Sequence, residues 1–317
     1  MPPASADSLR DELFTLRDWL RFAVSAFNDA RLVYGHGTDT AIDEAAFLIL
    51  SALHLPINEL DPWLDCRLAR SERDLIHGLI VARIATRKPA AYLTQSAWIQ
   101  DRKFYVDERV IVPRSFIGEL LCQDGLAAVA GDPAGISRVL DLCTGSGCLA
   151  ILAAEAFPNA IVDASDISPD ALDVAQRNVA DYALQGRINL IKSDLFNSLE
   201  TARYELIIAN PPYVTAAAVR EFPPEFRAEP QLAHLGGDSG LDLVNRILAD
   251  APAYLAADGA LVVEIGQGRD ALEAARPELP FLWLDTETSE GEVFALRASD
   301  LTVPVRRMTT SQAGRKT

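Results

Sequence analysis

The chain has 317 residues, of which 49% are hydrophobic, so it can bury one large core and a smaller one. Its 29 lysines and arginines against 45 aspartates and glutamates give a formal net charge of −16. This negative charge disfavours sequence-independent binding of nucleic acid, which requires lysines and arginines that contact phosphates. It is compatible with a basic protein partner. No apolar run reaches the roughly 18 residues of a membrane-spanning helix, and the first residues lack the pattern of a signal peptide.

The four cysteines, Cys66, Cys122, Cys143 and Cys148, form no Cys-x-x-Cys pair. Two of them flank a glycine loop, and Cys122 lies in an apolar helical stretch. We therefore interpret all four as reduced, small apolar residues of a cytoplasmic protein, and we expect no metal site.

Residues 1–90 are predicted to form a small helical domain. Apolar residues recur at helical spacing over 9–27 and over 39–53. Ser71 precedes a third such run and is predicted to be its N-cap, and Lys88–Pro89 ends that helix. We interpret this domain as the part that recognises the substrate.

Residues 91–114 are predicted to link this domain to the next one through a β-hairpin. Apolar and polar residues alternate from Ala97 to Val112, with Asp101–Arg102 at the turn. Phe104, in the second strand, is predicted either to line a substrate pocket or to lie in the core, and the sequence favours neither position. Trp98 fits packing within the linker.

From residue 115 to residue 300 strands and helices alternate, which predicts a Rossmann-like α/β fold, a parallel sheet with helices on both faces. The predicted helices cover 116–130, 148–156, 168–183 and 243–255, and the predicted parallel strands cover 139–142, 161–165, 188–192, 205–209 and 260–264. Segments 281–285 and 292–297 are typical of a closing antiparallel pair. The basic, polar residues 301–317 are expected to be disordered.

The loop between the first strand and its helix, residues 141–150, is a candidate cofactor site. Gly145 and Gly147 allow a tight turn with positive φ and the close approach of a ligand. The Gly-x-Gly-x-x-Ala spacing alone also fits the dinucleotide-binding fingerprint. Asp141 lies at the end of the strand, and a carboxylate there suits a cationic amino-acid headgroup better than a pyrophosphate.

Acidic residues also end the next two strands. Asp166 ends the second strand and can accept hydrogen bonds from both hydroxyls of a ribose, while the adjacent Ile167 can pack on an adenine. Asp194, which Leu195 follows, ends the third strand and can accept from the adenine amino group. Each aspartate alone also fits an ordinary turn or N-cap, but three acidic strand ends at one edge of a parallel sheet predict a ligand crevice.

The fourth strand runs directly into Asn210-Pro211-Pro212-Tyr213, the most specific motif in the chain. A planar amide or aromatic amine is a poor nucleophile because its lone pair is delocalised, as in a peptide bond. The Asn210 side-chain oxygen and the Pro211 main-chain carbonyl can accept its two N–H groups, and Tyr213 can stack on the flat group. Transfer of a methyl group from a sulfonium then depends on positioning and electrostatics, without a strong general base.

Together these motifs resemble the HemK/PrmC family of glutamine-amide methyltransferases, which use S-adenosylmethionine. The resemblance covers 34–296 and includes Glu229–Pro230 and 263–266 besides the motifs above. It implies a helical N-terminal domain, a hairpin linker and a Rossmann-like catalytic domain, with the catalytic residues Asn210, Pro211, Pro212 and Tyr213. The corresponding cofactor site consists of Asp141, Thr144, Gly145, Ser146, Gly147, Asp166, Ile167, Asp194, Leu195 and Asn210.

Three segments resemble the branch of this family that methylates a glutamine of the large-subunit ribosomal protein L-three. They are 34–39 with 43–45, the tripeptide 113–115 (Pro-Arg-Ser in place of the Pro-Arg-Pro of the release-factor enzymes), and the two cysteines beside the glycine loop. Phe116 stands where the family has a proline, and Ser239 where it has an aspartate. His36, between two glycines, fits a structural or substrate-contact role better than a catalytic one.

We expect the enzyme to methylate ribosomal protein L-three, either free or within a ribosome assembly intermediate, because an acidic surface suits a basic partner. Three alternatives are open: the Gly-Gly-Gln glutamine of a release factor, the adenine amino group of a nucleic acid, and a non-catalytic role in ribosome assembly. Ser115 and the segment around His36 speak against the first, and the net charge speaks against the second. The intact motif from Asn210 to Tyr213 speaks against the third.

Overall fold

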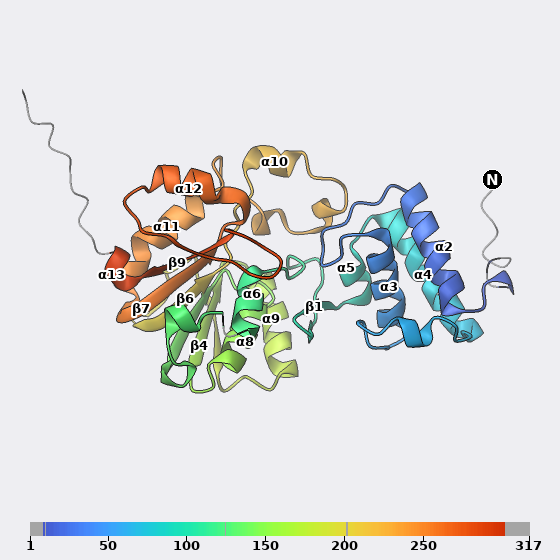
Figure 1. Ribbon diagram of the computed structural model, residues 1–317, viewed down its shortest axis with the longest axis horizontal. Coiled ribbons are helices and arrows are strands. Elements are labelled where there is room, and N and C mark those ends of the chain that lie inside the picture. Colours follow the sequence, from blue (N-terminus) through green and yellow to red (C-terminus); the bar gives the residue numbers. More distant parts are fainter. Residues whose placement is uncertain (1–8, 10, 124, 201, 302–317) are drawn as a thin grey trace, which may run out of the picture.

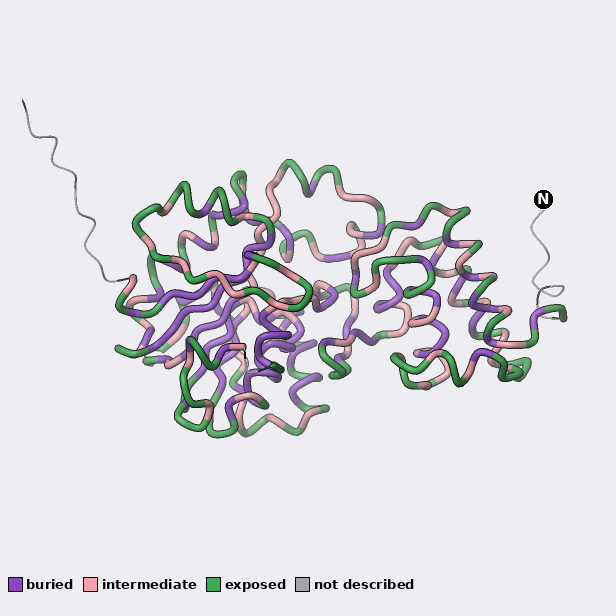
Figure 2. The backbone as a smooth tube through the Cα atoms, in the orientation of Figure 1, coloured by how far each residue is buried: buried purple, intermediate pink, exposed green. Residues whose placement is uncertain are grey.

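The computed structural model describes residue 9 and residues 11–123, 125–200 and 202–301 of the chain. The molecule is elongated, with a group of helices at one end and a sheet covered by helices at the other (Figure 1). Figure 2 shows that buried backbone is concentrated in these two parts. No helix in the described part of the chain is long and apolar enough to cross a membrane.

The N-terminal helical group contains α2 (Leu16–Asp29), α3 (Ala41–Ala52), α4 (Arg70–Thr86) and α5 (Ala90–Thr94). Their apolar faces meet in one cluster that includes the buried side chains of Trp19, Phe27, Leu48 and Ile80. Thr15 caps α2 and Thr40 caps α3, each accepting a main-chain N–H of the first turn. The helices predicted over 9–27 and 39–53 are therefore confirmed, although α2 and α3 begin only after their capping threonines.

The predicted N-cap at Ser71 is wrong. Helix α4 begins at Arg70, so Ser71 lies inside it, and the Ala69 N–H donates to the Glu72 carboxylate over 2.7 Å. That carboxylate satisfies a donor at the helix start, so a hydroxyl cap is not required. The helix ends before Lys88–Pro89 as predicted, and the short helix α5 follows the proline.

The linker hairpin is shorter than predicted. Strands β1 (Ala97–Ile99) and β2 (Arg102–Phe104) pair antiparallel across a turn at Gln100 and Asp101, both of which have positive φ. The second strand, predicted to reach Val112, stops at Phe104 because the Tyr105 N–H donates to the Asn178 side chain, at 2.7 Å, and not to β1.

A seven-stranded sheet forms the core of the C-terminal part, in the order β5-β4-β3-β6-β7-β9-β8. Its strands are β3 (Arg138–Leu142), β4 (Ile161–Asp166), β5 (Ile188–Lys192), β6 (Tyr204–Ala209), β7 (Leu255–Glu264), β8 (Leu282–Leu284) and β9 (Val293–Arg297). Strands β3 to β7 run parallel, while β9 pairs antiparallel with both β7 and β8. The predicted Rossmann-like sheet with a closing antiparallel pair is confirmed.

Helices cover both faces of the sheet. Successive residues along a strand point to opposite sides, so apolar side chains on both faces need a covering layer. The covering helices are α6 (Phe116–Cys122), α7 (Ala127–Ala130), α8 (Cys148–Ala156), α9 (Pro169–Asp181), α11 (Asp242–Asp250), α12 (Arg269–Ala275) and α13 (Ala298–Leu301), while α10 (Ala216–Arg220) lies in a lobe beside the sheet (Figure 1). Val139 packs in the cluster of α6 and α8, whereas Leu140 packs in that of α11 and α12. Phe104 joins the first cluster, fully buried, so of its two predicted positions it occupies the core one.

Two predicted helices are shorter in the structure. The helix predicted over 116–130 is divided into α6 and α7, and the one predicted over 243–255 ends at Asp250. Pro252 follows in a short 3-10 turn, because a proline cannot donate the hydrogen bond that would continue the helix. The predicted disordered tail lies, from residue 302 on, outside the described residues.

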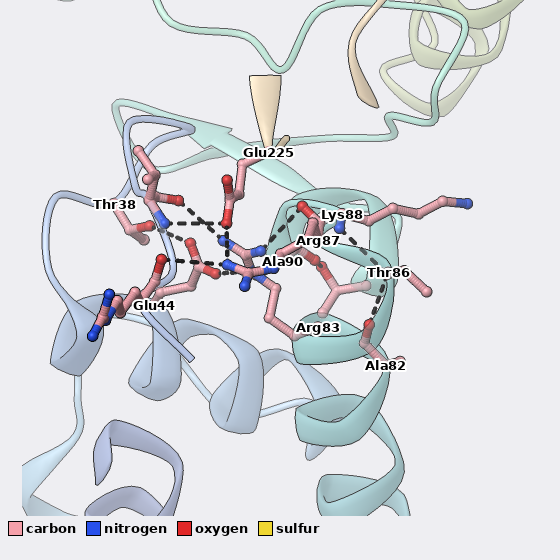
Figure 3. Close-up of polar contacts among 12 residues, drawn as sticks. Thr38, Glu44, Ala82, Arg83, Thr86, Arg87, Lys88, Ala90 and Glu225 are labelled. Atoms are coloured by element: carbon pink, nitrogen blue, oxygen red, sulfur yellow. Dashed lines mark hydrogen bonds and ion pairs between the residues drawn. The ribbon is translucent and has the colours of Figure 1, made fainter. Parts of the chain in front are cut away.

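A buried polar cluster connects the helical group to the sheet-containing part (Figure 3). Arg83 of α4 pairs with Glu44 of α3, and both side chains are buried. Arg83 also donates to the Val33 carbonyl over 3.2 Å. The Val33 N–H and the Arg87 guanidinium donate to Glu225, from the segment between α10 and α11, over 3.2 and 3.0 Å. These bonds join the two parts, while the domain boundaries at residues 90 and 114 stay predictions.

Removal of the Glu44 carboxylate is expected to destabilise the helical group. In Glu44→Ala the buried Arg83 guanidinium loses its charged partner, which costs about 3–5 kcal/mol for a buried pair. Urea unfolding followed by tryptophan fluorescence, to which Trp19 and Trp63 of this group contribute, measures the change. The matched variant Asp65→Ala breaks the exposed Arg17–Asp65 pair and should leave the unfolding midpoint unchanged. Equal midpoints for both variants would contradict this account of Glu44.

Candidate active site

A cavity of about 420 Å³ lies at the edge of the sheet where the parallel strands end. Ligands of open α/β sheets bind at this edge, and the volume is within the usual range of small-molecule sites. Among the predicted cofactor residues, those that line the cavity are Gly145, Asp166, Ile167, Asp194, Leu195 and Asn210. The others, Asp141, Thr144, Ser146 and Gly147, lie within or beneath the glycine loop and do not line it.

The glycine loop between β3 and α8 has the backbone that its sequence predicts. Gly145 and Gly147 have φ of 55° and 81°, in the left-handed region that favours glycine. A Cβ atom at Gly147 would lie 3.1 Å from the Cβ of Ala175, so this glycine also lets α9 pack closely. Cys143, in the same loop, lines the cavity, but burial raises the pKa of its thiol, which makes it a poor nucleophile.

Asp141 lies beneath this loop and is completely buried. Its Oδ2 accepts a hydrogen bond from the Thr144 hydroxyl over 2.5 Å, whereas its Oδ1 finds no partner among the described residues. Burial raises the pKa of Asp141 to about 7. Because an unpaired buried carboxylate oxygen is costly, this acceptor fits the cationic group that the sequence predicts for the amino-acid end of the cofactor.

Asp166 has the turn role that its sequence position allows, and its place in the cavity is compatible with the other predicted role, ribose binding. Its Oδ2 accepts the Gly145 N–H over 2.9 Å and its Oδ1 accepts the Ser168 N–H over 2.8 Å, so it holds the glycine loop and the start of α9. Each carboxylate oxygen has a second lone pair, and Asp166 also lines the cavity. It can therefore accept hydrogen bonds from ribose hydroxyls as predicted. Ile167 lines the cavity beside it with 48% of its surface exposed, as expected of a residue that packs on a planar base.

Asp194 is partly engaged within the protein, because Arg246 of α11 donates to its Oδ2 over 2.8 Å, while no bond to its Oδ1 forms among the described residues. Both residues line the cavity and are partly exposed. Arg246 was not predicted from the sequence. An arginine on the polar face of an amphipathic helix is usually solvent-exposed, so the sequence gives no sign of this pair. Only the folded sheet brings α11 beside the end of β5.

The amide of Asn210 is oriented by the linker. Its Nδ2 donates to the main-chain carbonyl of Arg114 at 3.4 Å. A carbonyl can only accept, so the amide oxygen faces away from Arg114 and is available to a donor in the cavity that Asn210 lines. Pro211 is buried, and no hydrogen bond to its carbonyl forms among the described residues. Both acceptors that the sequence predicts at this motif are therefore unused by the fold.

Tyr213 packs its ring flat against Gly266, which has a φ of 52°. A Cβ atom at position 266 would lie 2.7 Å from the ring, so the glycine is required for this packing. Burial, and next the carboxylate of Glu264, raise the pKa of Tyr213, so its phenol stays neutral. A neutral, fixed aromatic ring suits stacking on a planar amide.

A second cavity, of about 840 Å³, borders the same motif at Tyr213. Its walls come from the helical group, the hairpin, the linker and the sheet-containing part, and include Gly37, Trp98, Arg114, Ser115, Tyr213 and Glu264. The two departures from the family pattern, Phe116 and Ser239, also line it. Trp98 therefore faces a cavity and does not serve linker packing alone. The motif from Asn210 to Tyr213 thus contributes to two cavities, Asn210 and Pro212 to the first and Tyr213 to the second.

Glu229, whose sequence position predicts no particular role, is a central buried residue. Its carboxylate accepts two bonds from Arg114, and the ring nitrogens of His234 and His36 lie 3.0 and 3.6 Å from its Oε2. Burial raises its pKa, but His234, His36 and Arg114 together lower the pKa well below the usual range, so Glu229 stays charged. His36 is itself buried against the ring of Phe226. It therefore has a structural contact here, one of the roles its sequence predicts.

A Rossmann-like sheet with this crevice and this motif defines a methyltransferase that uses S-adenosylmethionine. Residues 129–222 match the family model described as "Methyltransferase small domain". Proteins named "Ribosomal protein uL3 glutamine methyltransferase" are similar over nearly the whole chain. The one from Bordetella pertussis is 55% identical and covers 92% of this chain and 98% of its own. The one from Bradyrhizobium diazoefficiens is 54% identical over 94% and 95%, and the one from Neisseria meningitidis serogroup B is 53% identical over 92% and 95%. The chain belongs to this family of ribosomal protein uL3 glutamine methyltransferases.

Cofactor affinity is expected to rise between pH 6 and pH 8. The carboxyl of Asp141, with its pKa raised to about 7, is mostly protonated at pH 6 and must lose its proton before it accepts a cationic ammonium. The dissociation constant of S-adenosylmethionine should therefore fall by up to about tenfold per pH unit below that pKa and level off above it. Titration calorimetry at several pH values measures this. Asp141→Asn should bind more weakly and lose the pH dependence; a wild-type affinity that is constant over this range would limit Asp141 to supporting the loop.

Proposed function

We propose that this enzyme transfers a methyl group from S-adenosylmethionine to the side-chain amide nitrogen of a glutamine in ribosomal protein uL3 (L-three). The observation that carries the proposal is the intact motif from Asn210 to Tyr213 between two cavities, with its amide oxygen and prolyl carbonyl unused by the fold. The names of the relatives support the choice of substrate.

In this mechanism the motif makes a poor nucleophile reactive. The Asn210 Oδ1 and the Pro211 carbonyl accept the two N–H groups of the glutamine amide and hold its nitrogen in one orientation. Tyr213 stacks on the amide plane and excludes water from it. When bound, S-adenosylmethionine supplies a methyl group on a sulfonium, which is a good leaving group. The amide proton leaves after transfer, so none of these residues acts as a strong base.

We assign the first cavity to the cofactor. Asp166 accepts from the ribose hydroxyls, Ile167 and Leu195 pack against the adenine, and Asp194 accepts from its amino group while Arg246 holds the carboxylate in place. Asp141 lies nearest the amino-acid end, below the loop formed by Thr144, Gly145, Ser146 and Gly147.

We assign the second cavity to the polypeptide around the target glutamine. Because its walls include Gly37, a substrate in this cavity would contact the helical domain of residues 1–90 as well as the catalytic domain. The net charge of −16 favours a basic partner such as a ribosomal protein, free or in an assembly intermediate. The reaction then takes place in the cytoplasm, where thiols stay reduced, in agreement with four free cysteines.

A transfer assay with methyl-labelled S-adenosylmethionine tests the proposal. Unmethylated uL3, a peptide release factor and a DNA duplex are offered side by side, and labelled residues are mapped by mass spectrometry. We expect label on one glutamine of uL3 alone. Label on the release factor or on adenine would show that the substrate is a different one. An assembly intermediate serves as a further sample, and the absence of label from every sample would contradict the proposal.

Two substitutions should separate catalysis from cofactor binding. Asn210→Ala removes an acceptor that acts on the amide during transfer, so kcat should fall at least about 100-fold while the cofactor dissociation constant stays within about twofold. Asp166→Ala removes a charged acceptor from the cofactor cavity, so that constant should rise roughly 10- to 100-fold. Calorimetry and steady-state kinetics on both variants measure the split. Parallel losses of affinity and kcat in Asn210→Ala would contradict the assigned roles.

A further inference from the structure

The linker segment 112–116 crosses the carboxyl ends of two neighbouring strands, β6, which leads into the methyl-transfer motif, and β7. Asn210 directly follows β6, and Glu264 ends β7, the next strand of the sheet. Within this segment the Arg114 carbonyl accepts from the Asn210 amide, and the next residue, Ser115, donates to Glu264. A small shift of the peptide group between Arg114 and Ser115 would therefore change the direction in which the Asn210 side-chain oxygen points.

Glu229 holds the Arg114 side of this peptide. It accepts the Arg114 guanidinium through two bonds of 2.8 and 2.9 Å and the Val112 N–H through a third of 2.8 Å. The Arg114 guanidinium also donates to the Val112 carbonyl over 3.0 Å, which closes a local turn. The side chain of Glu229 is 0% exposed and that of Arg114 is 32% exposed, so the carboxylate end of these charge-assisted bonds lies away from water, which makes the bonds strong and directional.

Glu264 holds the other side of the peptide. Its Oε2 accepts the Ser115 hydroxyl over 2.6 Å and the Phe116 N–H over 2.9 Å. The Ser115 hydroxyl also accepts the Ile117 N–H and caps α6. Because Glu264 belongs to β7, this side of the peptide is fixed to the rigid sheet, and Glu229 is the anchor that lies on a connecting segment.

We propose that Glu229 is a positioning residue for methyl transfer: through its paired bonds to Arg114 it fixes the main-chain carbonyl that orients the Asn210 amide. Glu229 itself lines neither cavity, so it acts without touching substrate or cofactor. The proposal rests on the proposed function, because it assigns Glu229 to the same amide-transfer step.

Glu229→Gln tests the proposal because it keeps the size of the side chain and removes its charge. The glutamine amide has one acceptor oxygen, so it cannot accept both hydrogen bonds from the Arg114 guanidinium. The main-chain carbonyl of Arg114 is then no longer held in place. Since a displacement of about 1 Å can cost about 100-fold in rate, kcat should fall roughly 10- to 100-fold. The KM for uL3 and the cofactor dissociation constant should stay within about threefold. Arg114→Lys, which keeps the cation and loses the fork, should give an intermediate kcat.

Glu225→Gln is the matched control. Glu225 lies in the same connecting segment, is also fully buried, and pairs with Arg87 and Val33, but it has no bond to residues 112–116. Its kcat should stay within about threefold of wild type. Because Glu229 and Arg114 act through one path, the double variant Glu229→Gln/Arg114→Lys should lose no more kcat than Glu229→Gln alone.

Full kcat in Glu229→Gln, or an equal loss of kcat in Glu225→Gln, would overturn the proposal. Melting curves with bound cofactor check that the variants fold, and if Glu229→Gln does not fold, Arg114→Lys decides: unchanged kcat overturns the proposal and reduced kcat at unchanged KM supports it. A wild-type enzyme that transfers no label to uL3 would instead contradict the proposed function, so the two failures are distinct.

Discussion

The carboxylate of Glu229 lies where three segments far apart in the sequence meet. His36 approaches it from the helical group, Val112 and Arg114 from the linker, and His234 from the segment before α11. Taking a charge out of water costs several kcal/mol, and only a complete set of donors offsets that cost. In the docked arrangement of the three segments, Arg114 and Val112 donate to the carboxylate and the two histidine rings lie close to it. That arrangement places residues 109–111 of the linker and residues around Pro230 at the first cavity.

The docking of these three segments also divides the candidate active site into two cavities. The first cavity is built from the ends of the parallel strands, where rigid backbone places Asp166 and Asn210. The second cavity needs the linker and the helical group as walls, so it exists only when these parts are docked on the sheet. The motif from Asn210 to Tyr213 lies between them, and amide methylation requires that position, since the nucleophile and the methyl group arrive from different molecules.

Much of the catalytic core could be predicted because its signals are local. A strand, a glycine loop and a helix follow each other within residues 138–156, and their backbone preferences do not depend on distant contacts. The hairpin was predicted too long because Asn178, in a helix more than seventy residues away, takes over the hydrogen bonds of Tyr105. Ser71 was misassigned as a cap because Glu72 satisfies the start of α4 instead.

By itself the sequence determined the order of strands and helices and the turn at Gly145 and Gly147, and it predicted the chemistry of Asn210 to Tyr213, because periodicity, positive φ and functional groups are properties of adjacent residues. Only the tertiary structure decided that Arg246 pairs with Asp194, that Gly266 makes room for the ring of Tyr213, and that Glu229 anchors the linker. Each of these joins residues whose proximity follows from the packing of the sheet and the linker. Burial then gives the charged contact at Glu229 its strength, since a carboxylate enclosed away from water depends on its partners far more than one on the surface.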